Sequence, residues 1–352
     1  MSDVPQVQID CRLFRPLLEE AFTATGISGE EARLIADSLI EAEVCEVPTH
    51  GMLRVPSYIR GLRSGRFNAR ADVRPVHQTD AATLFDGDNA LGYLPALRAC
   101  EAAVESAKRL GIGVAGTRNT NEFGRAAYYT EWIAAHGFFG IVAANTLPLL
   151  AGPGGAVATH GNNPLSYTLP GPDGPIFDAA WTPRSGGELV RRRMLGLTLP
   201  LEWGYTDKAG RPTTDPAAAA QSVAPAIGGA KGFGISLLVD MLAGVLTRAG
   251  FGPNIGPDNR GVGAFVLVID PDIFGAGALV PGSLEATADA VRASGSRLPG
   301  DRARAARAAH ADGHIGVASK IFDEMTKAIS EGDPGIGQRM QQAASPARPA
   351  TG

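Results

Sequence analysis

Residues 112–146 read IGVAGTRNTNEFGRAAYYTEWIAAHGFFGIVAANT, and this stretch indicates the fold class. Its first part, residues 112–118, is a short apolar run typical of a β-strand. Residues 123–137 have the pattern of a helix that ends at Gly137, because glycine is favoured just after a helix. Residues 138–146 are again apolar and predict a second strand. A strand, a helix and a strand in succession indicate an α/β protein.

The flanking sequence continues this alternation. Before it, Ser28 and Glu31 form a capping box that begins a helix ending at Pro48, and residues 73–86 have an extended pattern. After it, residues 171–230 are loop-rich, and a glycine cluster precedes a long helix. The remaining predicted segments are a helical segment from about 49 to 62, a helix at 95–110, a strand at 162–170, the long helix at 231–250, an apolar strand at 264–270 and helices at 283–294, 301–313 and 314–329.

Composition excludes several classes of protein. The chain has 352 residues, 44% of them hydrophobic and 19% charged, with a formal net charge of −4. Nucleic-acid binding needs a basic face, so we expect no nucleic-acid partner. No uncharged apolar run approaches the ~20 residues of a membrane span, and the first residues do not resemble a secretory signal. Three cysteines without a Cys-x-x-Cys pair indicate a reducing, cytoplasmic setting and no metal site.

Two glycine-rich segments resemble phosphate-binding loops to different degrees. GIGVAG at 111–116 matches the dinucleotide pattern literally, but a helix precedes its glycines, whereas the motif requires a preceding strand. We therefore interpret Gly111 as a helix C-cap. GGAKGFG at 228–234 lies before a helix, where Lys231 and free N–H groups suit an anion such as a phosphate. A flexible hinge is an equally good interpretation of this second cluster.

PTHGMLRVPSY at 48–58 places a histidine, His50, four residues before Arg54. Taken alone, the segment is a helix-to-loop junction with a surface histidine and arginine. A histidine titrates near neutral pH and an arginine binds carboxylates with a planar fork, so the pair also suits an active site. Spacing of four residues would place both side chains on one helical face.

Seven short motifs, in order, resemble the malate/L-lactate dehydrogenase family of NAD(P)-dependent oxidoreductases. This family is unrelated to the Rossmann-fold malate and lactate dehydrogenases, and the resemblance covers about residues 28–329. The motifs are THGMLRVPSY (49–58), DGDNALG (86–92), NTNEFG (119–124), GNNP (161–164), GRPTTDP (210–216), KGFGI (231–235) and PGD (299–301).

The resemblance implies a fold class, a cofactor and a set of site residues. The fold is α/β with a largely antiparallel central sheet, flanking helices, a non-Rossmann cofactor domain and terminal helical segments packed together. The cofactor is NADP or NAD, the substrate is a small carboxylate, and the protein is a homodimer. His50 corresponds to a proton donor and Arg54 to a carboxylate clamp, with Thr49 beside them. The implied cofactor contacts are Thr146, Asp178, Ala179, Ala180, Arg184, Lys231, Gly232, Gly300 and Asp301.

Two positions depart from the family pattern. Glu122 stands where relatives have a histidine, and a carboxylate there disfavours an anionic 2-oxo acid and favours a cationic iminium. The segment AWTPRSGG after Asp178 also differs, which leaves the choice between NAD and NADP open; Arg184 within it is either a contact to a 2′-phosphate or a surface residue.

The predicted function is hydride transfer between a nicotinamide and a carbon next to a carboxylate, in a 2-oxo or 2-imino acid. The alternative is a divergent member without redox turnover that binds a nucleotide or metabolite or performs a non-redox step. The expected organisation is an N-terminal helical segment with His50 and Arg54 (1–80), an α/β core (81–283), C-terminal helices packed on the N-terminal segment (284–330) and a disordered tail (331–352).

Overall fold

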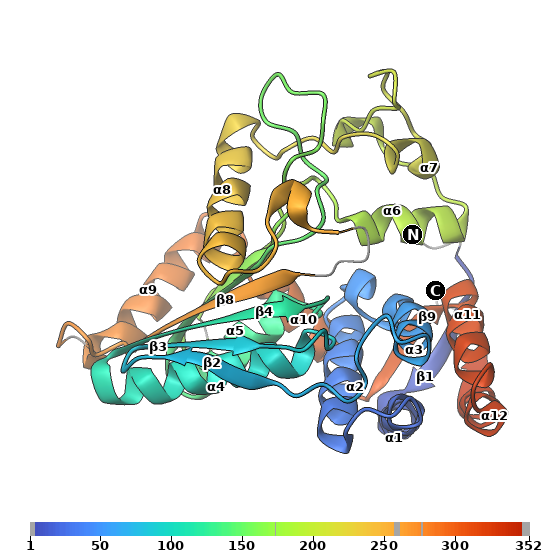
Figure 1. Ribbon diagram of the computed structural model, residues 1–352, viewed down its shortest axis with the longest axis horizontal. Coiled ribbons are helices and arrows are strands. Elements are labelled where there is room, and N and C mark those ends of the chain that lie inside the picture. The colour runs from blue at the N-terminus through green and yellow to red at the C-terminus, as the bar shows by residue number, and fades with distance from the viewer. Residues whose placement is uncertain (1–3, 173, 257–260, 276, 347–352) are drawn as a thin grey trace.

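A computed structural model describes residues 4–346 except 173, 257–260 and 276 (Figure 1). Its larger sheet has seven strands in the order β2-β3-β4-β8-β5-β6-β7. Every neighbouring pair is antiparallel except β3 with β4. The strands are β2 (Arg74–Gln78), β3 (Ala82–Asp86), β4 (Ile112–Thr120), β5 (Phe139–Ala144), β6 (Leu165–Thr168), β7 (Ile176–Ala179) and β8 (Val262–Ile269). This sheet confirms the predicted α/β fold with a largely antiparallel sheet.

Helices cover the two faces of this sheet unequally. On one face α4 (Tyr93–Leu110) and α5 (Ala126–Ala135) pack against β4, β5 and β8 and form an apolar core with them. On the other face lie α8 (Ala230–Asp240) and the π-helical turn η4 (Met241–Val245) that continues it (Figure 1). Gly111 ends α4 with a φ of 79°, which confirms the predicted C-cap and excludes GIGVAG as a phosphate loop.

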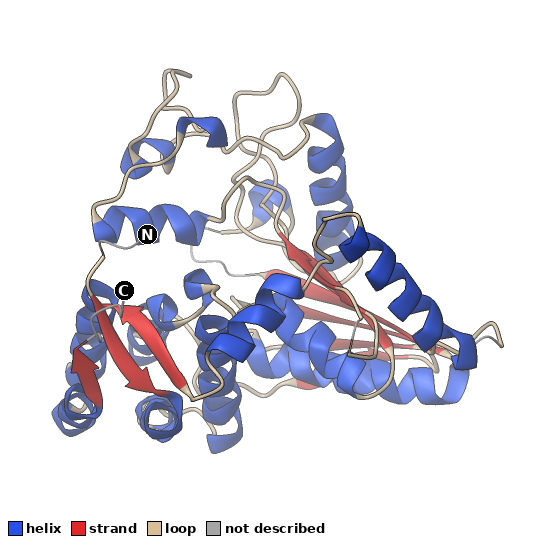
Figure 2. Ribbon diagram, turned by 180° about the vertical axis from the view of Figure 1, so that it is seen from behind, coloured by secondary structure: helices blue, strands red, loops and turns tan. Residues whose placement is uncertain are grey.

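The two ends of the chain build a second unit beside the sheet (Figure 2). A small antiparallel sheet has the order β10-β1-β9, from β1 (Gln6–Asp10), β9 (His314–Ala318) and β10 (Ala344–Pro346). The helices around it are α1 (Cys11–Thr23), α2 (Gly29–Val44), α3 (Val55–Arg63), α11 (Ser319–Ser330) and α12 (Pro334–Ala343). Residues from both ends share one apolar core, so the terminal segments pack together as predicted.

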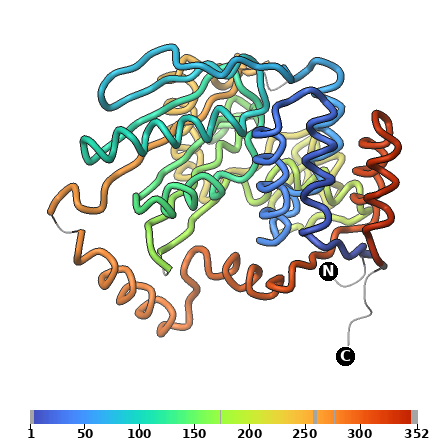
Figure 3. Tube along the Cα trace, turned by 90° about the horizontal axis from the view of Figure 1, so that it is seen from below, coloured from blue at the N-terminus to red at the C-terminus, as the bar shows by residue number. Residues whose placement is uncertain are grey.

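The remaining elements connect these two units. Helix α6 (Gly186–Leu195) and the short α7 (Pro216–Ala219) lie in the loop-rich region, and α9 (Val280–Ala293) and α10 (Asp301–Ala309) lead back along the outside to β9 (Figure 3). Short 3-10 turns are η1 (Pro48–His50), η2 (Met52–Arg54), η3 (Leu201–Trp203), η5 (Gly252–Asn254) and η6 (Gly277–Leu279). No helix in the described part of the chain is long and apolar enough to cross a membrane.

Two sequence predictions were wrong at the ends of the chain, and two elements there were missed. The predicted helix at 314–329 begins with strand β9, because Ile315 and Val317 alternate into the core. The predicted disordered tail contains α12, which Asp333 caps and which buries Ile336 and Met340; residues 347–352 lie outside the described residues. The strand β1 and helix α1 were not predicted at all.

The segment carrying His50 is fixed by a buried carboxylate. Glu43, in the last turn of α2, accepts a hydrogen bond from the backbone N–H of Met52 at 2.7 Å. A Cβ at Gly51 would lie 2.3 Å from the same Glu43 Oε1, so only glycine leaves room for this contact. Burial of the Glu43 side chain raises its pKa to about 7, although the Met52 N–H and Arg191 act in the opposite direction.

We predict that Glu43→Gln raises the melting temperature more at pH 8 than at pH 5. A raised carboxyl pKa means that the folded state holds its proton more tightly than the unfolded chain does. The free energy of unfolding of the wild type therefore falls as the pH rises from the pKa of the unfolded chain through the folded-state pKa of about 7. The amide cannot ionise and still accepts from Met52. At ~1.4 kcal/mol per pKa unit, the gain in the free energy of unfolding should be larger at pH 8 than at pH 5 by on the order of 3 kcal/mol. Thermal unfolding of both proteins at the two pH values measures this gain. Glu105→Gln on the exposed side of α4 is the control, and an equal gain at both pH values contradicts the prediction.

Candidate functional site

One cavity of about 630 Å³ lies where the N-terminal unit meets the end of the large sheet. Its walls come from η1 and η2, from the loops after β4 and β5, from β7 and the residues after it, and from α6. Nine residues singled out in the sequence line it: Thr49, His50, Arg54, Glu122, Thr146, Asp178, Ala179, Ala180 and Arg184. A cavity of this volume accommodates small-molecule ligands.

His50 and Arg54 lie on two successive 3-10 turns that are separated at Gly51, and not on one α-helical face as the spacing predicted. Both side chains nevertheless line the cavity. The Nδ1 atom of His50 is 3.1 Å from the hydroxyl oxygen of Thr49. Burial in the cavity wall, with the nearby charges of Arg54 and Arg125, lowers the pKa of His50 to about 3. The imidazole is therefore neutral at pH 7 when no ligand is bound.

Arg54 makes an ion pair inside the cavity with Glu122, the residue that departs from the family pattern. Its Nη1 donates to Glu122 Oε1 at 3.1 Å, and its Nε donates to the carbonyl of Thr49 at 2.7 Å. The side chains of Arg54 and Glu122 are 20% and 33% exposed, so a ligand in the cavity can reach both. A Cβ at Gly187 would lie 2.8 Å from Arg54 Nη2, which shows how closely α6 packs on the guanidinium.

The cavity is also lined by polar groups suited to a nucleotide. Thr146 donates through its hydroxyl to Asn162 Oδ1 at 2.9 Å. Asp178 accepts from the backbone N–H of Ala127, in the first turn of α5, at 3.0 Å. The guanidinium of Arg184 is exposed and lies 4.8 Å from the centre of the Trp203 ring. Thr146 and Arg184 lie on loops after strands, where binding residues are common, and Asp178 lies in β7.

Four predicted cofactor residues do not line this cavity. Lys231 is exposed in the first turn of α8, and Gly232 packs on the backbone of Ile227. Gly300 has a φ of 100° and packs on Ile176. The Asp301 carboxylate binds Arg292 at 2.9 Å and Arg304 at 2.8 Å, so it stabilises the start of α10. These four residues therefore lie outside the cavity in the structure, and their role as cofactor contacts stays a prediction.

Tyr58, Asn121 and Arg125 are among the lining residues that the sequence did not single out as site residues. The side-chain N–H of Asn121 donates to backbone carbonyls at 89 and 90, but its buried Oδ1 has no partner among the described residues. Arg125 is 5% exposed and pairs with Glu131 at 2.7 Å. Their shared loop, RNTNEFGR, was the available signal, because it joins a strand to a helix.

These residues fit a nicotinamide nucleotide. The unpaired Asn121 Oδ1 is a buried acceptor that matches an amide N–H₂ group such as the nicotinamide carboxamide. Arg184 offers an exposed guanidinium, which suits a phosphate. No cluster of three or more His, Cys, Asp or Glu side chains in the described ranges has the arrangement of a metal site.

Curated relatives of the chain are dehydrogenases. L-sulfolactate dehydrogenase of Methanothermobacter thermautotrophicus is 32% identical over 72% of this chain and 76% of its own length. Ureidoglycolate dehydrogenase (NAD(+)) of Escherichia coli K12 is 30% identical over 76% of this chain and 78% of its length. (2R)-3-sulfolactate dehydrogenase (NADP(+)) of Chromohalobacter salexigens is 32% identical over 85% of this chain and 91% of its own length.

Solved structures share the fold. A dehydrogenase from Sinorhizobium meliloti superposes with a TM-score of 0.85 at 31% identity, covering 92% of this chain and 98% of that one. Malate dehydrogenase from Pyrococcus horikoshii has a TM-score of 0.84 at 24% identity, covering 93% of this chain and 96% of that one. The family model for malate/L-lactate dehydrogenase matches residues 10–326. The chain therefore belongs to the malate/L-lactate dehydrogenase family and is an oxidoreductase that uses NAD or NADP.

Proposed function

We propose that this enzyme transfers hydride between a nicotinamide and a carbon next to a carboxylate, in a 2-oxo or 2-imino acid. The observation that supports this most strongly is that His50 and Arg54 line the same cavity as Thr146, Asp178 and Arg184. The bound nicotinamide supplies or accepts the hydride. Thr146, Asp178, Ala179, Ala180 and Arg184 would hold the cofactor, and Asn121 Oδ1 would accept a hydrogen bond from its carboxamide.

His50 handles the proton in this proposal. When an oxo group is reduced, the imidazole donates a proton to the oxygen, and when a hydroxyl is oxidised, the neutral ring accepts it. The lowered pKa of His50 favours the neutral ring, so the unliganded site suits the accepting role at pH 7. Thr49 orients the ring through the contact between its hydroxyl and Nδ1.

Arg54 holds the substrate carboxylate in this proposal. One of its terminal nitrogens, Nη1, binds Glu122, and its Nε is fixed by the carbonyl of Thr49. The other terminal nitrogen, Nη2, remains to bind a carboxylate. A guanidinium held at one edge is preorganised, which lowers the entropy lost when a ligand binds.

Binding and turnover measurements test this function. We expect NADH or NADPH to quench tryptophan fluorescence and to be oxidised with 2-oxo or 2-imino acids. His50→Gln should lower kcat for oxo-acid reduction by about 10²-fold or more while cofactor binding stays unchanged. Cofactor binding without any oxidation across such a panel would contradict the proposal and favour a family member without redox turnover.

Two adjacent glycines provide a matched test of the carboxylate clamp. We predict that Gly187→Ala weakens oxamate binding about tenfold, because its Cβ displaces Arg54 Nη2 by steric contact. Gly186→Ala should bind oxamate like the wild type, since the nearest atom to its Cβ is 3.8 Å away. Isothermal titration calorimetry measures both dissociation constants. Equal values for the two variants would exclude this role for Arg54.

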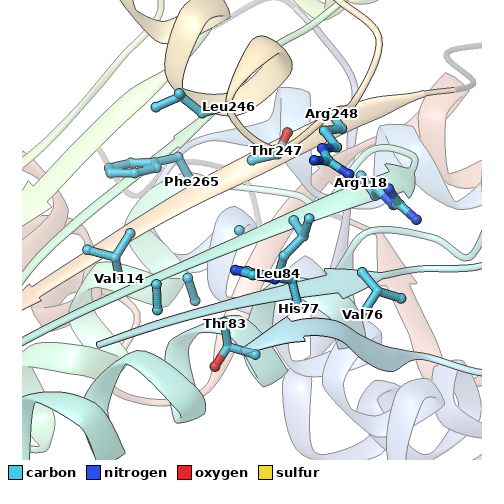
Figure 4. A pocket seen from close by; sticks show the side chains of 13 residues that line it. Val76, His77, Thr83, Leu84, Val114, Arg118, Leu246, Thr247, Arg248 and Phe265 are labelled. Carbon is cyan, nitrogen blue, oxygen red and sulfur yellow. The ribbon is translucent and has the colours of Figure 1, made fainter. Parts of the chain in front are cut away.

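The enzyme is further proposed to be a cytoplasmic homodimer. Cytoplasmic location fits the three buried, unpaired cysteines. Exposed apolar side chains support the dimer. They lie on α8, on η4 and at the residue after it, near a groove of about 450 Å³ over β3, β4 and β8 that Arg118 and Arg248 also line (Figure 4). The exposed apolar residues are Ile235, Leu238, Met241, Val245 and Leu246, between 37% and 67% exposed.

A charge in this surface should separate the subunits. We predict that Leu238→Glu combined with Leu246→Glu halves the mass measured by light scattering, because burial of two carboxylates in an apolar interface is costly. Leu13→Glu is the control, since Leu13 is exposed to a similar degree on α1. A double variant that keeps the wild-type mass would show that this face is not the interface.

A further inference from the structure

We propose that Glu122 makes the site select a substrate whose reacting carbon bears a cationic nitrogen, that is, a 2-imino acid in its iminium form in preference to a 2-oxo acid. The inference rests on the proposed hydride transfer and specifies its substrate. It follows from the ion pair between Arg54 and Glu122, from the position of that pair in the cavity with His50, and from the proton requirements of the two reactions.

The backbone holds the Glu122 carboxylate in the cavity. The carbonyl of Glu122 accepts from the backbone N–H of Gly92, just before α4, at 2.8 Å. A Cβ at Gly92 would lie 2.5 Å from the carbonyl oxygen of Asn121, so the two backbones approach as closely as glycine permits. The backbone of Glu122 is therefore held in place by its own loop. From this position its carboxylate reaches Arg54 Nη1.

The charges of this pair match a zwitterion. Arg54 and Glu122 are electrically balanced before any ligand enters, with one guanidinium nitrogen already bound to a carboxylate. A 2-oxo acid adds a second carboxylate beside Glu122 and brings no positive charge. An iminium acid places its carboxylate on Arg54 and its positive nitrogen toward Glu122, so both site charges have a partner.

The proton balance of the two reactions favours the same substrate. Hydride added to an iminium carbon pushes the electron pair of the C=N bond onto nitrogen, which already carries its proton, and a neutral amine results. Hydride added to an oxo carbon leaves an alkoxide that needs a proton from the protein, and the Glu122 carboxylate opposes that negative charge. Reduced nicotinamide is the reductant in both cases.

The titratable neighbours of the pair are poor proton donors at neutral pH. Burial, Arg54 and Arg125 lower the pKa of His50, so its ring has lost the proton it would donate. Tyr58 also lines the cavity, and its hydroxyl lies 3.4 Å from that of Tyr93. Burial raises the pKa of Tyr58 well above its usual value, so loss of its proton is unfavourable. An iminium substrate needs neither residue as a donor.

Two ligands of equal shape test the inference without turnover. Pipecolate and cyclohexanecarboxylate have the same six-membered ring and carboxylate, and only pipecolate carries a cationic nitrogen next to the carboxylate-bearing carbon. By calorimetry, wild type should bind pipecolate at least about tenfold more tightly. Glu122→Gln keeps the shape and removes the charge, so the two dissociation constants should become similar. Glu105→Gln, which removes an exposed glutamate remote from the cavity, should retain the wild-type ratio.

The outcomes separate the inference from the function on which it rests. Similar affinity of wild type for the two ligands overturns the role of Glu122, and this result does not depend on whether any variant folds. Absence of binding by both ligands overturns the carboxylate site itself, and with it the proposed function. Catalysis provides a second readout: the ratio of kcat/KM for Δ1-piperideine-2-carboxylate to that for 2-oxohexanoate should fall in Glu122→Gln and fall further in Glu122→His.

Discussion

The antiparallel pairing of β1 with β9 is the constraint on which the site depends. It joins residues 6–10 to residues 314–318, so the two ends of the chain form one core. Helix α3 packs on α11 from that core, and Arg60 pairs with Glu324 and Glu331 across the contact. The 3-10 turns that carry His50 and Arg54 lead directly into α3. Their position relative to the large sheet therefore depends on residues more than 250 positions away.

The positive charges that line the cavity are held in different ways. Three cations, Arg54, Arg125 and Arg184, line it, and each is differently restrained: Arg54 by Glu122, Arg125 by Glu131, and Arg184 by stacking on Trp203. Burial, together with the two paired cations, lowers the pKa of His50, whereas the exposed Arg184 remains accessible to an anion. The cavity thus offers both paired and accessible positive charges.

Some elements could be predicted because their signals are local. The capping box at Ser28 gives α2 its start, and the Ser28 hydroxyl accepts from the Glu31 N–H as expected. Glycine at 111 ends α4, and uncharged apolar runs form β4, β5 and β8. The strand β9 was misread, because HIGVA is too short for its alternation to outweigh the helical pattern that follows. Strand β1 exists only because β9 and β10 pair with it.

The sequence by itself determined the α/β class, the family and nine of the residues that line the cavity, since those depend on local periodicity and ordered motifs. Only the tertiary structure decided that Lys231, Gly232, Gly300 and Asp301 lie outside the cavity, and that Asn121 and Arg125 lie within it. It also decided that Arg54 binds Glu122. The physical reason is that ion pairs and cavity walls join residues 68 positions apart, and a distance of that kind is fixed by packing, not by spacing along the chain.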